Sequence, residues 1–151
     1  MRRFFLITMV LMLSGCASVS IPNYIYDEHP YKRTVYAPFD KARDATAQTF
    51  EEFGWMVEKE SNPSLFEREK VGEEGKRQTL ILTEVRQSYF FLGSRYSRVN
   101  AYLREIADKE TEIEIRYLRV TSILFKSFYH YTNDKMVERI FNHIEQKLLS
   151  L

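Results

Sequence analysis

The only cysteine of the chain, Cys16, is separated by two residues from the end of an apolar segment and carries the one thiol, which can form a thioether or a disulfide. Arg2 and Arg3 precede the apolar segment, which covers residues 4–13. That length is well below the roughly 20 apolar residues that cross a bilayer core. A basic start, a short apolar stretch and then small residues are typical of a secretory signal peptide.

The last residues of this leader resemble the lipobox of bacterial lipoproteins, and they read Leu13-Ser14-Gly15-Cys16. The resemblance implies that a diacylglycerol is attached to the Cys16 sulfur, that residues 1–15 are removed, and that the new amine is acylated. Several acyl chains, such as palmitate, give lasting membrane attachment, whereas one chain binds only marginally. Ala17, in place of aspartate, implies sorting to the outer membrane of a Gram-negative bacterium, facing the periplasm. The alternative is an ordinary signal peptide with an incidental cysteine.

The sequence contains no recognisable catalytic or metal-binding motif. A G-x-S-x-G nucleophile elbow and a phosphate-binding glycine loop are both missing from the sequence. The three histidines, His29, His130 and His143, do not have the spacing of a zinc site. We therefore expect a protein that is not an enzyme and that holds no cofactor and no metal.

Glu110, Glu112 and Glu114 lie on one face of a predicted strand, beside Arg116. The two carboxylates of a glycosidase lie about 5–10 Å apart across a cleft, on separate elements. Three acids on a single strand are more typical of a solvated sheet face, which is what we expect here.

The segment Arg86–Arg98 (RQSYFFLGSRYSR) mixes aromatic and arginine side chains at a predicted hairpin, with the turn at Gly93-Ser94. Both residue types are enriched at binding hot spots, and an exposed apolar tip usually has a partner. The alternative is that the tip folds under the helices or the N-terminal segment, with a second aromatic stretch, residues 124–131, covering it. The candidate partner-binding residues are Tyr89, Phe90, Phe91, Arg95 and Tyr96.

Composition limits the possible partners. Removal of residues 1–15 from the 151-residue chain leaves 136 residues, enough for one domain with a real core. The net charge changes from +1 to about −1, because the leader contains two arginines and no acid. A nearly neutral domain has no overall attraction to nucleic acid, so we expect no nucleic-acid partner.

Residues 16–32 are predicted to be a lipidated N-terminus and tether, and residues 33–151 a single α+β domain. The tether contains Tyr24, Tyr26 and Tyr31, too many aromatic residues for a purely solvated linker. It packs either on its own domain or on a partner.

Alternating apolar residues predict strands, and apolar residues at helical spacing predict helices near both ends of the domain. Asp40 is the expected N-cap of the first helix and Gly54 its C-terminal end. The predicted strands are 33–37, 55–58, 65–71, 77–89, 98–107 and 110–120, and the predicted helices are 39–54 and 133–149.

The order β-α-β(4–5)-α predicts an antiparallel sheet of about five or six strands with both helices on one face. With the segment FDKARDATAQTFEEFGWMV, this order resembles the helix-grip, TATA-binding-protein-like topology and the domains of the BamC family of outer-membrane lipoproteins. BamC proteins belong to the machinery that assembles outer-membrane β-barrels and carry two such domains, whereas this chain has room for one.

The expected function is that of a membrane-anchored, non-enzymatic accessory or scaffold subunit that binds another envelope protein. The alternative is a periplasmic carrier that holds a small apolar or lipid ligand in a helix-grip cavity.

The lipobox generates the first prediction. Replacement of Cys16 by serine removes the sulfur that receives the diacylglycerol, so Cys16→Ser protein is expected to leave the detergent phase in Triton X-114 partitioning or to remain unprocessed. Unchanged partitioning of the processed variant would show that another feature holds the protein at the membrane.

Overall fold

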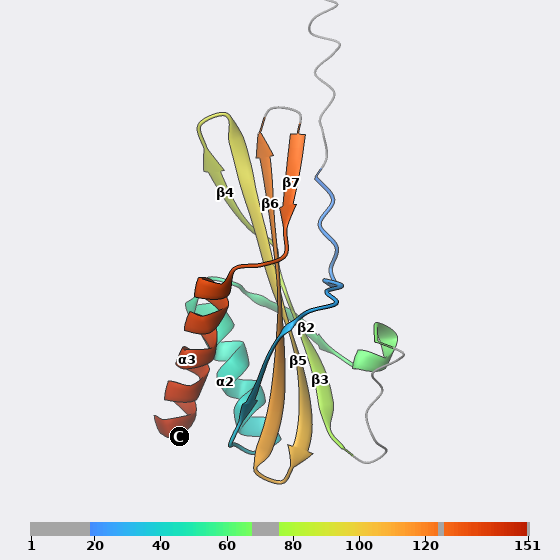
Figure 1. The fold of residues 1–151 in the computed structure, drawn as a ribbon, viewed down its shortest axis with the longest axis vertical. Coiled ribbons are helices and arrows are strands. Elements are labelled where there is room, and N and C mark those ends of the chain that lie inside the picture. The colour runs from blue at the N-terminus through green and yellow to red at the C-terminus, as the bar shows by residue number, and fades with distance from the viewer. Residues whose placement is uncertain (1–18, 68–75, 124–125, 151) are drawn as a thin grey trace, which may run out of the picture.

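The computed structural model describes residues 19–67, 76–123 and 126–150, and it contains one antiparallel sheet with two helices on one face (Figure 1). This is the predicted α+β class, although the sheet has seven strands rather than five or six. Cys16 and the predicted signal peptide lie outside the described residues, as does most of the predicted strand at 65–71.

Two long strands, β5 (Gly93–Ala107) and β6 (Glu110–Ile123), form the centre of the sheet. They pair along almost their whole length around the predicted turn at Asp108-Lys109. Each is too long for a single neighbour on its outer side, so two shorter strands share each outer edge.

The half of the sheet nearest that turn has the strand order β1-β6-β5-β3-β2. The other half has the order β4-β5-β6-β7 and extends beyond the helices (Figure 1). We call this extension the β-arm: β4, β7, residues 93–97 of β5 and residues 119–123 of β6. The shorter strands are β1 (Tyr31–Val35), β2 (Val57–Ser61), β3 (Gln78–Thr83), β4 (Arg86–Phe90) and β7 (Lys126–His130).

The main core lies between the sheet and the helices α2 (Phe39–Glu52) and α3 (Asp134–Ser150). The sheet contributes the alternating residues that the sequence predicts on the two long strands, and α3 contributes its predicted apolar stripe. Both patterns are confirmed. The buried members include Val99, Ala101, Leu103, Ile113, Ile115, Tyr117, Val137, Ile140, Phe141 and Ile144.

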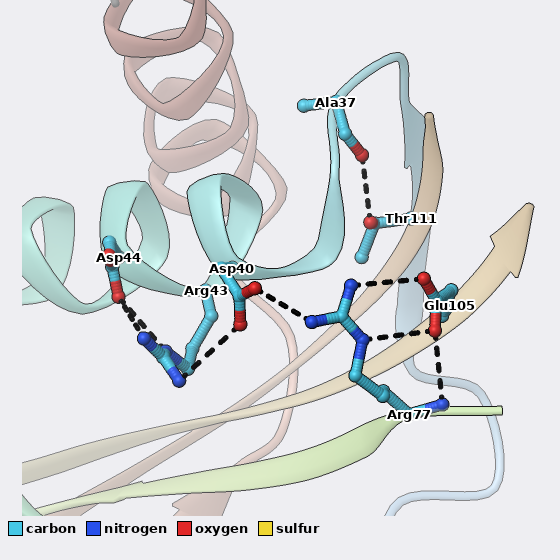
Figure 2. A network of polar contacts seen from close by, with 7 residues as sticks. All are labelled: Ala37, Asp40, Arg43, Asp44, Arg77, Glu105 and Thr111. Carbon is cyan, nitrogen blue, oxygen red and sulfur yellow. Dashed lines mark hydrogen bonds and ion pairs between the residues drawn. The ribbon is translucent and has the colours of Figure 1, made fainter. Parts of the chain in front are cut away.

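The predicted N-cap of α2 is wrong, whereas its predicted end is right. Pro38 occupies the N-cap position without a side-chain cap, and Asp40 lies in the first helical turn. There the Asp40 carboxylate accepts a hydrogen bond of 2.7 Å from Arg77, which precedes β3 (Figure 2). At the other end Gly54 has a φ of 85°, a conformation that glycine adopts without strain.

Arg77 links the start of α2 to the sheet, because its guanidinium also donates to the Glu105 carboxylate of β5 at 3.1 and 3.2 Å (Figure 2). The hydrogen bonds from Arg77 hold the pKa of Glu105 below its ordinary value. The stabilisation from this pair is therefore present above the ordinary carboxylate pKa and is lost as the pH falls through the lowered one.

The strand predicted at 77–89 is two strands, because the chain leaves the ladder between Thr83 and Arg86. At this break the Thr83 hydroxyl donates to the Val99 carbonyl at 2.7 Å and accepts from the Val99 amide at 3.3 Å. The Thr83 side chain thus takes the place of a backbone hydrogen bond between the strands. The alternation of apolar residues does not reveal such a break.

Two other segments have a different structure from the one predicted. Residues 63–65 form a short 3-10 helix, η1, capped by the Asn62 side chain, and no strand begins there. The aromatic stretch before α3 contains β7, which pairs with β6 as part of the β-arm and does not cover the arm's tip.

The packing of α3 generates the second prediction. Ile140 is fully buried between α3 and the sheet, so Ile140→Ala should lower the free energy of unfolding by about 2–5 kcal/mol in urea titrations. The matched control is Glu138→Ala on the exposed face of the same helix, where loss of an ion pair with Arg33 should cost at most about 1 kcal/mol. Equal losses at both positions would contradict the assigned helix face.

Candidate protein-binding surface

The β-arm exposes large apolar side chains at its tip. Phe91 is 88% exposed, Tyr89 is 78% exposed and Leu92 is 59% exposed. Within the described residues, neither helix nor the N-terminal segment covers them (Figure 1). Of the two arrangements left open by the sequence, the structure therefore has the exposed tip.

The turn of the β4–β5 hairpin is Phe91-Leu92, two residues before the predicted position at Gly93-Ser94. Two-residue hairpin turns favour Asn-Gly or similar pairs, because they need backbone conformations with positive φ. Leu92 nevertheless has a φ of 71°, which is uncommon for a residue other than glycine. The chain thus places two apolar residues at a position where polar residues or glycine are favoured, a pattern that occurs at functional sites.

Gly93 belongs to β5 and is required by close packing. A Cβ atom added to it would lie 2.2 Å from the Ser122 carbonyl oxygen and 2.7 Å from the Phe90 ring. The Phe90 ring therefore occupies the space that a side chain at position 93 would need. The Arg95 guanidinium lies 5.9 Å from the centre of the Phe90 ring, within the range of a cation–π contact.

The strand register divides the predicted binding residues between two faces of the β-arm. Phe90 and Arg95 lie on the same side of the sheet as the helices, in rows that continue to Ile123 and Phe128. We call these four residues the arm face. Tyr89 and Tyr96 point to the opposite side, and Phe91 lies in the turn.

Tyr96 is not a free contact residue. It is half-buried against the cluster of Ile25, Leu118 and Val120, and its hydroxyl accepts a hydrogen bond from Gln87 at 3.2 Å. The sequence analysis also missed Ile123 and Phe128, which are 38% and 49% exposed. The alternation of the stretch KSFYH was the available signal for a further strand beside β6.

Arg86 fixes the base of the β-arm to the end of α2. Its guanidinium donates to the Phe53 carbonyl at 2.9 Å and lies 5.8 Å from the centre of the buried Trp55 ring. The arm is therefore attached to the helical layer on one side.

The N-terminal segment, residues 19–30, attaches the sheet on its other side. Ile25 is fully buried in a cluster with Leu118 and Val120, and Val19 and Ile21 pack against this cluster. The predicted tether therefore packs on its own domain, one of the two arrangements left open by the sequence.

Two polar side chains of β5 bind the backbone of this segment. Arg98 donates to the Pro22 carbonyl at 2.9 Å and to the Asn23 side chain at 2.7 Å. Asn100 donates to the Asn23 carbonyl at 3.0 Å. Both β5 side chains are buried, so these bonds fix the segment at the point where it crosses the sheet.

The face predicted to be solvated on β6 is instead buried at Glu114 and Arg116, whereas Glu110 and Glu112, nearer the β5–β6 turn, are half-buried. The Arg116 guanidinium is 2.6 Å from the Glu67 carboxylate and 3.2 Å from Glu114, and it donates to the Tyr24 hydroxyl at 3.1 Å. Tyr24 in turn stacks on Phe66 with ring centres 5.0 Å apart. The expectation of a wet strand face fails because residues 19–30 and 62–67 cover it.

Charge and burial act in opposite directions on this cluster. Burial by itself would lower the pKa of Arg116, but the hydrogen bond and charge of Glu67 outweigh it and raise the pKa above its usual value. Burial is also the main cause that raises the pKa of Tyr24, so the phenol stays protonated. The cluster is therefore a guanidinium held by two carboxylates and a neutral tyrosine.

The space that a helix-grip carrier would use as a cavity is filled. Phe50, Ala101 and Ile140, which are fully buried, belong to one cluster between the helices and the sheet. A groove of about 310 Å³ lies instead at the outer edge, between β1 and the end of α3, beside Tyr36 and Leu148.

Among the described residues, no group of three or more His, Cys, Asp and Glu side chains could hold a metal ion. His143 contacts the Glu52 carboxylate between α3 and α2. None of the helices within the described ranges is long and apolar enough to span a membrane.

Comparison of the chain with family models, curated proteins and solved structures gave no match. The resemblances to bacterial lipoproteins and to BamC domains therefore remain predictions from the sequence.

The buried cluster generates the third prediction. Arg116→Ala leaves Glu67 and Glu114 buried without the guanidinium, so the free energy of unfolding should fall by about 3–5 kcal/mol. The matched control is Arg104→Ala, which removes a more exposed pair with Glu112 and should cost at most about 1 kcal/mol. Chymotrypsin cleavage after Tyr24 should also accelerate only in the Arg116 variant, and equal behaviour of the two variants would contradict the central role of Arg116.

Proposed function

We propose that this protein is a lipid-anchored, non-enzymatic accessory protein of the outer membrane that faces the periplasm and binds another envelope protein through its β-arm. The anchor is Cys16, acylated after removal of residues 1–15. The single observation that carries the proposal is the exposed aromatic and basic surface of the arm, on a hairpin pair that is attached to the domain on both sides.

The arm face has the composition of a binding surface. Phe90 and Phe128 offer partly exposed rings, and Arg95 offers a guanidinium with planar donors for a carboxylate or a backbone carbonyl. Aromatic and arginine side chains dominate the energetics of protein interfaces. Because the strands hold these groups in place, a partner loses little entropy in ordering them.

The filled helix–sheet interface favours this function over that of a ligand carrier. A carrier needs an enclosed apolar space, whereas the described side chains between α2, α3 and the sheet pack against one another.

Simultaneous replacement of Arg95 and Phe128 by alanine tests the arm face. If these residues form the centre of the interface, in-cell crosslinking to the partner should fall at least about tenfold. Both side chains are exposed, so the thermal midpoint should change little.

The matched control is Tyr129→Ala. Tyr129 is 48% exposed, compared with 49% for its neighbour Phe128, but it lies on the opposite face of β7. This control should keep the crosslink. A folded Arg95/Phe128 variant with full crosslinking would place the partner elsewhere.

A further inference from the structure

We infer that the turn of the β-arm, Phe91-Leu92, enters the interfacial region of the same membrane that holds the lipid anchor. The inference rests on the acylation of Cys16 in the proposed function, and it adds a second point of membrane contact. It concerns the turn, whereas the proposed protein partner binds the arm face.

The length of chain between the anchor and the folded domain supplies the first argument. Val19 already packs against the cluster around Ile25, so only the peptide units between Cys16 and Val19 separate the acylated sulfur from the domain. A fully extended chain spans at most about 3.5 Å per residue, which limits this distance to about 10 Å. The domain is therefore held close to the bilayer surface.

The direction of the arm supplies the second argument. When the described N-terminal segment is followed from Tyr31 back to Val19, it runs along the sheet beside β7. Its Val19 end therefore lies toward the end of the molecule where the β-arm protrudes (Figure 1). Tyr96 packs against the same cluster as Val19, and Gly93, next to the turn, lies three strand positions farther along the arm. At about 3.4 Å per residue the arm extends roughly 10 Å from Tyr96 to Gly93, with Phe91-Leu92 beyond it, so the turn reaches about as far toward the bilayer as the anchor can.

The chemistry of the arm supplies the third argument. An apolar turn flanked by tyrosines matches the amphipathic aromatic side chains that concentrate at membrane–water interfaces. Residues 86–98 and 118–131 contain five lysines and arginines and no aspartate or glutamate. Two of these cations, Arg95 and Lys126, lie on the arm strands near the turn, where they suit anionic lipid headgroups.

The turn itself gives a reason for its unusual sequence. Phe91 and Leu92 expose apolar surface and hold Leu92 at a positive φ, neither of which stabilises the hairpin. Insertion of the turn into the interface removes this apolar surface from water. A bilayer thus fits the turn in three respects: its surface is within reach, its anionic headgroups complement the cations of the arm, and its interface accepts apolar side chains.

A spin label at the turn tests the inference in the complete lipidated protein. Because Cys16 is the only cysteine and is acylated, Phe91→Cys introduces the single free thiol for a nitroxide. The labelled protein is reconstituted in vesicles of phosphatidylethanolamine and phosphatidylglycerol, and its collision rates with oxygen and with a water-soluble nickel complex are measured. Leu92→Cys provides an independent second label.

The matched control is Tyr36→Cys, since Tyr36 is 85% exposed and lies in the loop between β1 and α2, at the opposite end of the sheet. The ratio of oxygen to nickel collisions should be several-fold higher at positions 91 and 92 than at position 36. Ratios at all three positions typical of water, in protein that floats with the vesicles, would overturn the inference and leave the anchoring intact.

Two other outcomes would also overturn it. A turn label shielded from oxygen and nickel alike would show that protein, not lipid, covers the turn. Protein that does not float with the vesicles, and whose Cys16 carries no lipid by mass spectrometry, would contradict the proposed anchoring and with it the membrane contact of the turn.

Discussion

The buried guanidinium of Arg116 holds together the layer that covers the sheet face opposite the helices. It binds Glu114 on its own strand, Glu67 after η1 and Tyr24 in the N-terminal segment. Arg116 thus links two segments that are far apart in the sequence, and Tyr24 and Phe66 of these segments also stack directly on each other. Because both carboxylates are buried as well, the cluster is stable only when all of its members are in place.

Because of this second layer, the N-terminal segment is fixed on the sheet and is not a flexible linker. A flexible tether of residues 16–32 would let the domain move freely below the membrane. The buried Ile25 and the hydrogen bonds from Arg98 and Asn100 instead bring the start of the fold to Val19. The described N-terminal segment, from Val19 on, and the β-arm then form one mechanical unit, so in the proposed lipoprotein the fold sets the orientation of the arm relative to the membrane.

The attachment of the β-arm on both sides gives its tip a defined position. Arg86 joins the arm to the end of α2, and Tyr96 packs against the cluster in which Ile25 of the N-terminal segment is buried. A hairpin fixed in this way presents its aromatic side chains without a large loss of conformational entropy on binding. The proposed protein contact of the arm face and the proposed lipid contact of the turn both depend on this rigidity.

Much of the fold could be predicted from the sequence, because periodicity reflects burial on one face. The alternation around Ile113 and Ile115 and the apolar stripe of α3 identified the helix-side core correctly. The second face could not be predicted, because Glu114 and Arg116 alternate as solvated residues do and only tertiary contacts bury them. The aromatic hairpin was identified from its composition, but whether its tip is exposed was left open, and its turn was misplaced, because glycine was expected in the turn and Gly93 is required by packing against Phe90.

The most direct test of the account is the backbone mobility of the N-terminal segment, measured by ¹⁵N relaxation of the lipidated protein in detergent micelles. If Arg116, Arg98 and Asn100 fix this segment on the sheet, the order parameters from Asn23 to Tyr26 should equal those of β5, at about 0.85. Values below about 0.6 at these residues would show a flexible tether. That result would contradict the claim that the N-terminal segment and the β-arm form one rigid unit.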